Sequence, residues 1–328
     1  MHAAIETAAC RACVEACPCG AWHLDDTALE FNASRCDGCG LCVPACPGQA
    51  ISLPLALAIR PLAGSHAVLA ACAHAGAEAS GHVGPGLVPC LHAIGTADLL
   101  RAYRAGQHAW LLAHGDCAAC PRGQGETLFA RVAHVNAALR QRGRRPMLTR
   151  QVSPATWFAL VTDADAVGAQ ARRAFLRSLS RRPATLLTGT AAVTEAERTG
   201  APGEDLPDGE DALMPWTVNL DAGRCVGCHA CTRVCPRGAI EYDTAASAYR
   251  LRHRACTGCG LCRDVCAHRA VALRAWAEPT QWLLPLAERR CARCGVTYTA
   301  PTAAAGKHAH CWVCAAKQQP SRLYQVMA

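Results

Sequence analysis

The chain has 328 residues, of which 24 are cysteine, and its formal net charge is +8. This many cysteines in a chain of this length exclude a small disulfide-stapled secreted domain and indicate that thiolates bind metal. Hydrophobic residues make up 51% of the chain, which is enough for hydrophobic cores and excludes a wholly disordered protein.

Residues 1–59 contain two cysteine runs of related spacing. The second run follows the pattern C-x2-C-x2-C-x3-C-P and consists of Cys36, Cys39, Cys42 and Cys46. The first run keeps three cysteines of this pattern, which are Cys10, Cys13 and Cys17. Its first position is occupied by Thr7, so one ligand is missing.

The spacing predicts how these cysteines share iron-sulfur clusters. Three thiolates of one run hold one 4Fe-4S cluster, and the fourth reaches the neighbouring cluster. The predicted groups are Cys36, Cys39, Cys42 with Cys17 for one cluster, and Cys10, Cys13 with Cys46 for the other. For the second group three alternatives stay open: a 3Fe-4S cluster, a fourth ligand from Cys19, or no cluster. We favour Cys19.

Residues 60–150 alternate between strand and helix patterns, which predicts a small α/β domain of half-Rossmann type. Strands are expected at Ala67–Cys72, Gly86–Leu91 and Gln107–His114, and helices at Thr96–Ala105 and Glu126–Arg142. The apolar run Ala50–Ile59 before this domain has ten residues, too few to cross a membrane. Because Met1–Cys10 also has no signal-peptide pattern, we expect a cytoplasmic protein.

The central domain carries four further cysteines, which are Cys72, Cys90, Cys117 and Cys120. They could hold a 2Fe-2S cluster or another metal, Cys117 and Cys120 could form a redox dithiol, or all four could be small buried side chains. The segments around Cys90 (Val88-Pro89-Cys90), Leu99-Leu100-Arg101-Ala102 and His114-Gly115-Asp116-Cys117 are similar to the iron-sulfur subunit domain of methyl-viologen-type hydrogenases. That resemblance implies a small cluster at the sheet edge. His114 and Asp116 are interpreted as structural.

Residues 151–215 separate this domain from the next cysteine-rich part. A basic amphipathic helix is predicted from Ala164 to Ser180. The stretch Gly200–Pro215 is dense in glycine, proline and acidic residues, which is typical of a linker.

Residues 216–275 contain two complete cysteine runs. The first is Cys225, Cys228, Cys231 and Cys235, and the second is Cys256, Cys259, Cys262 and Cys266. Crossed ligation predicts two 4Fe-4S clusters, one on Cys225, Cys228, Cys231 and Cys266 and one on Cys256, Cys259, Cys262 and Cys235. Arg224–Leu273 resembles a bacterial two-cluster ferredoxin domain, although Ala267 stands where that family usually has proline.

Residues 276–328 contain two C-x2-C knuckles, formed by Cys291, Cys294, Cys311 and Cys314. Four thiolates in two knuckles predict a zinc-ribbon-like module with one tetrahedral Zn²⁺. A rubredoxin-type iron would use the same ligands, and zinc is the favoured metal.

The predicted fold class is therefore a multidomain α+β protein. Two 2[4Fe-4S] ferredoxin-like modules flank a small α/β domain, and a zinc ribbon follows. No dinucleotide fingerprint, P-loop or nucleophile elbow accompanies the cysteines, so no catalytic residue is predicted. Three or four 4Fe-4S clusters suit an electron-transfer protein rather than an enzyme by itself.

As a whole the chain resembles the multi-cluster ferredoxin proteins found beside bacterial formate dehydrogenases. The resemblance implies a redox partner such as a formate dehydrogenase, another molybdoenzyme, a hydrogenase or a quinone reductase. The alternative is a non-catalytic accessory factor that helps to assemble a molybdenum oxidoreductase.

The net charge of +8 and the zinc ribbon also raise the hypothesis of a nucleic-acid-binding protein. Four 4Fe-4S clusters and one Zn²⁺ with their thiolates contribute about −10, which takes the charge of the loaded protein to roughly −2. We therefore interpret the basic residues as compensation for the metal centres and expect no nucleic-acid partner.

Overall fold

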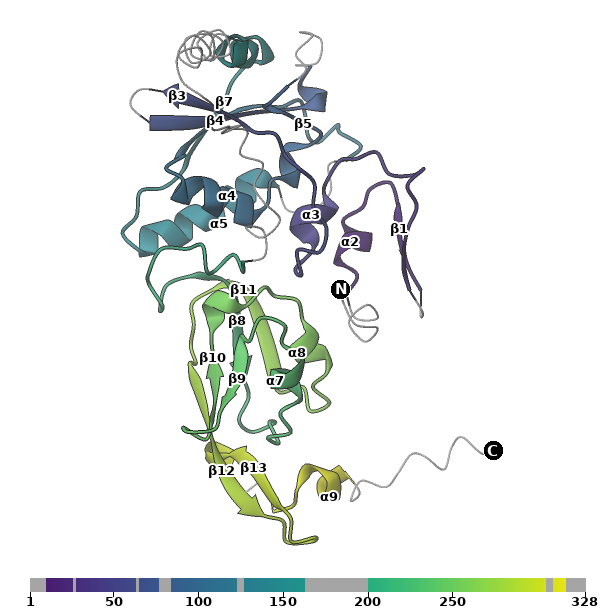
Figure 1. The fold of residues 1–328 in the computed structure, drawn as a ribbon, viewed down its shortest axis with the longest axis vertical. Coiled ribbons are helices and arrows are strands. Elements are labelled where there is room, and N and C mark those ends of the chain that lie inside the picture. Colours follow the sequence, from purple (N-terminus) through teal and green to yellow (C-terminus); the bar gives the residue numbers. More distant parts are fainter. Residues whose placement is uncertain are drawn as a thin grey trace, which may run out of the picture. The chain divides into compact units, whose positions relative to one another are not determined.

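The computed structural model describes residues 10–25, 28–62, 65–76, 84–122, 127–162, 200–304 and 309–316. The chain divides into two compact units, Met1–Gly200 with Asp205–Pro207 and Ala201–Glu204 with Asp208–Ala328 (Figure 1). The predicted basic helix Ala164–Ser180 lies outside the described residues.

The N-terminal part of the first unit consists of short elements around the cysteine runs. They are α2 (Ala12–Glu15), β1 (Trp22–Leu24), β2 (Leu29–Phe31) and α3 (Cys42–Ala45). The strands β1 and β2 form an antiparallel hairpin in which Trp22 lies opposite Phe31 with their ring centroids 4.7 Å apart. The chain from residue 51 to 57 has no regular secondary structure and leads into the central sheet.

The central sheet of the first unit has five strands. They are β3 (Ala58–Leu62), β4 (Ser65–Cys72), β5 (Leu87–Val88), β6 (Ala109–Ala113) and β7 (Leu148–Gln151). The strand β4 pairs antiparallel with β3 and parallel with β5 and β6, and β6 pairs parallel with β7. Residues 67–72 of β4 are all buried, as expected for an apolar strand covered on both faces. The predicted strand Gly86–Leu91 is shorter, because Pro89 has no N–H to donate and the chain then enters the 3-10 turn η3 (Leu91–Ala93).

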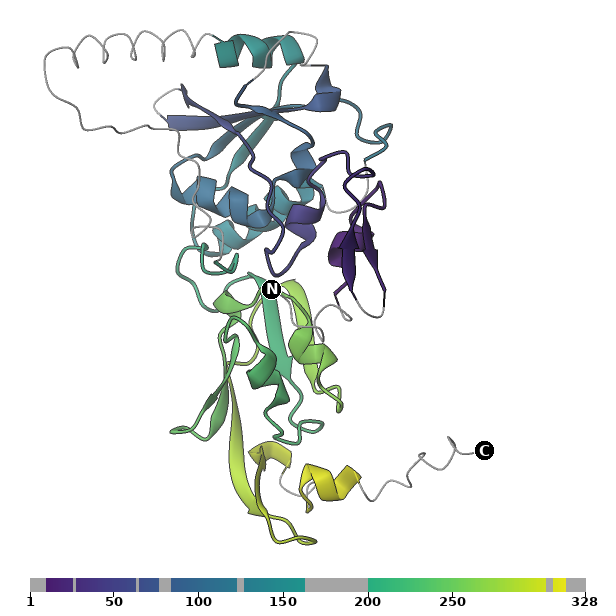
Figure 2. The same cartoon turned by 45° about the vertical axis from the view of Figure 1, so that its right-hand side comes forward.

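Helices cover both faces of this sheet. The helices α4 (Thr96–Arg104) and α5 (Leu128–Gln141) lie on one face, and residues 154–162, also helical, lie on the other (Figures 1 and 2). At the start of α5, Thr127 Oγ1 accepts the N–H of Ala130 at 3.2 Å. Trp157 and Val161 pack against Leu69 in a buried cluster, so the central fold extends beyond residue 150.

The second unit contains the two complete cysteine runs and the C-terminal knuckles. The strands β8 (Met214–Leu220) and β11 (Val271–Ala277) form an antiparallel pair, and α7 (Ala230–Val234) and α8 (Leu261–Asp264) follow the ligand loops. A second sheet has the order β13-β12-β10-β9. Its strands are β9 (Ile240–Asp243), β10 (Ala248–Leu251), β12 (Leu283–Arg290) and β13 (Thr297–Pro301), and α9 (Trp312–Ala316) ends the described part. The C-terminal hairpin β12–β13 thus continues the β9–β10 sheet.

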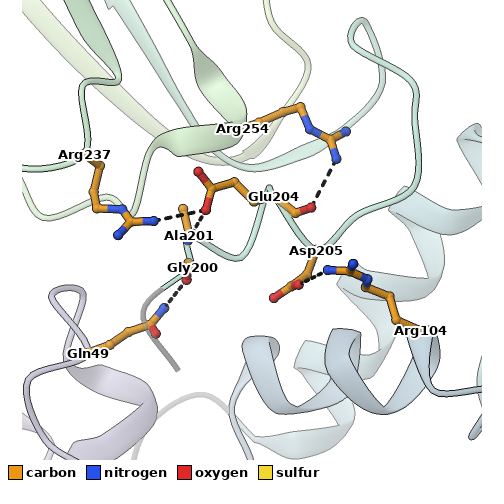
Figure 3. A network of polar contacts seen from close by, with 8 residues as sticks. All are labelled: Gln49, Arg104, Gly200, Ala201, Glu204, Asp205, Arg237 and Arg254. Atoms are coloured by element: carbon orange, nitrogen blue, oxygen red, sulfur yellow. Dashed lines mark hydrogen bonds and ion pairs between the residues drawn. The ribbon is translucent and has the colours of Figure 1, made fainter. Parts of the chain in front are cut away.

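The stretch predicted as a linker is held by specific polar contacts (Figure 3). Within the first unit, the side chain of Gln49 donates to the carbonyl of Gly200 at 2.8 Å, and Arg104 pairs with Asp205 at 2.6 Å. Within the second unit, the carboxylate of Glu204 accepts from Arg237 at 3.0 Å and from the N–H of Ala201 at 2.8 Å.

Among the described residues, no helix is both long and apolar enough to cross a lipid bilayer.

The packing of residues 154–162 on the sheet can be tested by truncating Trp157, whose side chain is 0% exposed. We expect Trp157→Ala to lower the free energy of unfolding by about 3–5 kcal/mol, because it leaves a cavity against the sheet. Leu148→Ala, at a position that is 54% exposed, should change it by less than about 0.5 kcal/mol. Anaerobic urea unfolding of both variants measures the difference. Equal effects would contradict this packing.

Candidate iron-sulfur and metal sites

The eight cysteines of residues 225–266 fall into two crossed groups in the second unit. Burial, and then Cys225, Cys228 and Cys266, raise the pKa of Cys231 to about 12. The thiols of the first run therefore have the last cysteine of the second run as their neighbour, as the spacing predicts. This group is Cys225, Cys228, Cys231 and Cys266.

The second group has the complementary composition. Burial raises the pKa of Cys256 to about 12, and the nearby Cys235 and Cys259 contribute to the rise. Burial also raises the pKa of Cys262, next to Cys256, Cys235 and Cys259, with Cys231 of the first group as a further neighbour. Thiols whose pKa is raised in this way become thiolates when a cationic centre compensates their charge, which iron supplies.

A small cavity lies among the cysteines of this second group. It is lined by Cys235, Cys256, Cys259 and Cys262 together with apolar side chains that include Val218, Ile240 and Leu273. The indole of Trp216 packs on Gly258 so closely that a Cβ at that glycine would come within 2.2 Å of the ring. The ligand set and its apolar surroundings fit a 4Fe-4S cluster.

All four runs end in the same local turn. The third residue after the last cysteine has a left-handed backbone, and the fourth residue donates its N–H to the cysteine sulfur. The donated bonds are Ala21 to Cys17 at 3.2 Å, Ala50 to Cys46 at 3.3 Å, Ala239 to Cys235 at 3.1 Å and Ala270 to Cys266 at 3.3 Å. Because N–H donors stabilise a thiolate, this turn prepares the last sulfur of each run for metal. The irregular first run keeps the turn in full.

The N-terminal cysteines show the same crossed neighbours. Burial raises the pKa of Cys42, and Cys17 and Cys36 contribute to the rise. Burial, followed by Cys10 and Cys46, raises the pKa of Cys13 to about 11. The structure thus brings together Cys17 with the second run and Cys46 with the first.

Cys19 lies beside the other group. Burial and then Asp37 raise the pKa of Cys19, and Cys17 is the nearby cysteine. The cysteines named beside Cys13 are Cys10 and Cys46, and Cys19 as the fourth ligand stays a prediction.

The C-terminal knuckles bring four cysteine sulfurs within 4.8 Å of one another; the residues are Cys291, Cys294, Cys311 and Cys314, and we call them the knuckle site. The sulfurs of Cys294 and Cys311 are 3.8 Å apart. A tetrahedral Zn²⁺ with Zn–S bonds of about 2.3 Å separates its sulfurs by about 3.8 Å, so the donor set fits. Burial opposes ionisation of Cys291, but N–H donors of Cys311 and Cys294 outweigh it and lower its pKa to about 5.

The hairpin of the knuckle site contacts a ligand loop of the ferredoxin-type fold. His229 follows Cys228 with a left-handed φ of 60°, at the position that Gly260 occupies in the second run. Its Nδ1 lies 3.0 Å from the hydroxyl of Tyr249, and its Nε2 lies 3.0 Å from Oγ1 of Thr299 on β13. Burial and Arg233 lower the pKa of His229. Sequence reasoning missed this residue, although aligning the two runs of this unit shows a histidine at the position where the second run has glycine.

The four central cysteines of the first unit line one pocket. Cys72 ends β4, Cys90 follows β5, and Cys117 and Cys120 follow β6, so the carboxyl ends of parallel strands place them at one sheet edge. The pocket has an apolar lining. Burial raises the pKa of Cys90, and Cys72, Cys120 and Cys117 contribute to the rise.

Two polar residues beside this pocket have local partners. His114 Nδ1 lies 2.8 Å from the carbonyl of Gly115, and its ring meets Phe129 edge-on with centroids 5.3 Å apart. Asp116 accepts the N–H of Ala118 at 2.9 Å. These contacts suit structural roles for both side chains.

Comparisons with known families agree with the thiol groups. Residues 224–270 match the 4Fe-4S dicluster domain, and residues 29–52 match the 4Fe-4S binding domain. A search of curated proteins found none that matches the chain. The two matched domains support a multi-cluster ferredoxin-like protein with an iron-sulfur electron-transfer role.

The ligands of the irregular N-terminal group can be tested by paired substitutions. We expect Cys13→Ser to lower the iron content by about three to four atoms per chain, because it removes one of three thiols. Cys19→Ser, whose thiol lies beside Asp37, should leave the iron content unchanged. Anaerobic iron and sulfide analysis of both variants measures this. An equal loss of iron in Cys19→Ser would make Cys19 the fourth ligand.

Proposed function

We propose that this chain passes single electrons through its clusters to or from a partner oxidoreductase. The observation that carries the proposal is the pair of crossed four-thiol groups in residues 225–266, within the stretch that matches the dicluster domain. When bound there, a 4Fe-4S cluster supplies a reversible one-electron couple. The residues of the chain hold the sulfurs, donate N–H groups to them and exclude water with apolar side chains such as Val218 and Leu273.

The proposed set of centres follows the thiol groups. The second unit holds two 4Fe-4S clusters, and Cys17 with the second N-terminal run holds a third. Cys10, Cys13 and Cys46 suit a 3Fe-4S cluster, which needs three thiolates. A 2Fe-2S cluster is proposed for the central pocket, and the support is the four cysteines that line it.

We further propose Zn²⁺ at the C-terminal knuckle site. The support is the tetrahedral spacing of the four sulfurs and the hydrogen bond from the N–H of Cys311 to Cys291 Sγ at 3.2 Å. This ion fixes the end of the hairpin β12–β13, where Cys291, Cys311 and Cys314 form a small buried cluster with Tyr298 packed against it.

The partner class rests on the resemblance of the whole chain to ferredoxin proteins beside formate dehydrogenases. A formate dehydrogenase or another molybdoenzyme is the proposed partner, with a hydrogenase or a quinone reductase as further members of the same class. The cytoplasm is the proposed compartment.

Elemental analysis of anaerobically purified protein tests the set of centres. We expect about seventeen iron atoms per chain from three 4Fe-4S clusters, one 3Fe-4S cluster and one 2Fe-2S cluster, together with one zinc. After reduction with dithionite, the protein should give cluster EPR signals and reduce a low-potential dye. Loaded protein that gives neither signal nor electron transfer would contradict the carrier role and favour the accessory role. About eight iron atoms would show an empty first unit.

A further inference from the structure

Two cysteine sites of the first unit meet in the interior. Cys39 of the second N-terminal run and Cys90 of the central pocket pack with Leu41 in one buried cluster. The three side chains are 7%, 8% and 5% exposed, so little water reaches this contact. One ligand of each site therefore touches the same small apolar core.

The backbone segments that carry these two cysteines also lie close to each other. The helix α3, which begins at Cys42, contacts η3, which begins directly after Cys90. A Cβ added at Gly40 would come within 3.0 Å of Cβ of Ala93. Only a glycine therefore allows this approach between the ligand loop and the turn.

Hydrogen bonds of one arginine connect three loops that carry cysteines. Arg122 follows Cys120 and Pro121, and its Nε donates to Oδ2 of Asp37 at 2.6 Å. Its Nη1 donates to the carbonyl of Pro89, which precedes Cys90, at 3.0 Å. Asp37 in turn accepts the N–H of Cys39 at 3.1 Å. The side chain of Arg122 is 17% exposed, so these bonds lie mostly out of water.

The charge of Arg122 acts on both sites. A guanidinium stays protonated in proteins, and the hydrogen bonds of Arg122 to Asp37 and to the carbonyl of Pro89 hold its positive charge beside the loops of Cys39 and Cys90. A fixed positive charge beside a cluster favours the state with the extra electron. The guanidinium of Arg122 therefore favours reduction of a cluster at either site.

We propose that an electron passes directly between the N-terminal 4Fe-4S site and the central four-cysteine site through the buried cluster of Cys39, Leu41 and Cys90, with Arg122 as the positioning residue. The proposal rests on the proposed occupancy of both sites. In each transfer one site loses one electron and the other gains it, and no bond or proton changes place. The first electron comes from a low-potential one-electron donor, for which dithionite stands in. The rate of electron tunnelling falls steeply with distance, so one ligand of each site in the same small buried cluster provides a short path.

Electron paramagnetic resonance of the fully reduced, full-length protein tests whether the two sites are neighbours. We expect the 2Fe-2S signal to relax severalfold faster than that of an isolated cluster, because a second paramagnetic centre lies close to it. Cys36→Ser, which removes a ligand of the N-terminal cluster, should abolish this enhancement and leave the 2Fe-2S signal in place. A 2Fe-2S signal whose relaxation is the same in Cys36→Ser and in the unmodified chain would overturn the direct path while the carrier function stands.

Substitution of Arg122 tests its role. In Arg122→Gln we expect both midpoint potentials to fall and the freeze-quenched transfer between the sites to slow about tenfold. Arg122→Lys keeps the positive charge and should restore the midpoint potentials. An ammonium group cannot reproduce the two-pronged donation of the guanidinium to Asp37 and to the carbonyl of Pro89. Arg140→Gln, at an exposed position of α5, is the matched control and should change neither quantity. Unchanged potentials and transfer rate in Arg122→Gln would overturn the role of this residue.

The occupancy on which the proposal rests is measured separately. Cys72→Ser should remove the 2Fe-2S signal and about two iron atoms while the 4Fe-4S signals stay. If the unmodified chain has no such signal and Cys72→Ser loses no iron, the proposal of a central cluster is wrong. The direct electron path is then contradicted as well, whereas the proposed role as a 4Fe-4S electron carrier is unaffected.

Discussion

Burying a thiolate in apolar surroundings raises its free energy, and three more thiolates beside it add mutual repulsion. This happens in both four-thiol groups of the second unit, where burial and neighbouring thiols raise the pKa values of Cys231 and Cys256 to about 12. Cationic iron or zinc removes the repulsion and turns each crowded group into a stabilising centre. Because the elements around the cysteines are short, we interpret metal binding and folding of these modules as one process.

Local backbone geometry prepares the sulfurs before any metal arrives. The same turn closes all four runs and directs one N–H at the last cysteine, including Cys17 of the irregular run. Thr7 in place of a cysteine therefore changes the ligand count of one group without disturbing the turn that serves the other. This explains how an incomplete run can lie beside a complete N-terminal cluster.

The C-terminal hairpin that carries the knuckle site is structurally part of the ferredoxin-type fold. The strand β12 pairs with β10, and Thr299 of β13 lies 3.3 Å from the carbonyl of Gly227 in a ligand loop. His229 adopts a left-handed backbone, which costs about 1 kcal/mol for a residue other than glycine, and two hydrogen bonds offset this cost. A metal bound at the knuckle site would therefore also stabilise the strand β13 that contacts the Cys225–Cys228 loop.

The spacing of the cysteines determined the crossed ligand groups, because three ligands of each cluster come from one short loop whose geometry is local. The alternation of strands and helices likewise predicted the central α/β fold around Ala67–Cys72. Only the tertiary structure decided that Cys72, Cys90, Cys117 and Cys120 line one pocket, that Cys19 lies beside Asp37, and that Arg122 reaches Asp37. These contacts join residues far apart in the chain, so they depend on strand order and packing, which no local spacing or periodicity encodes.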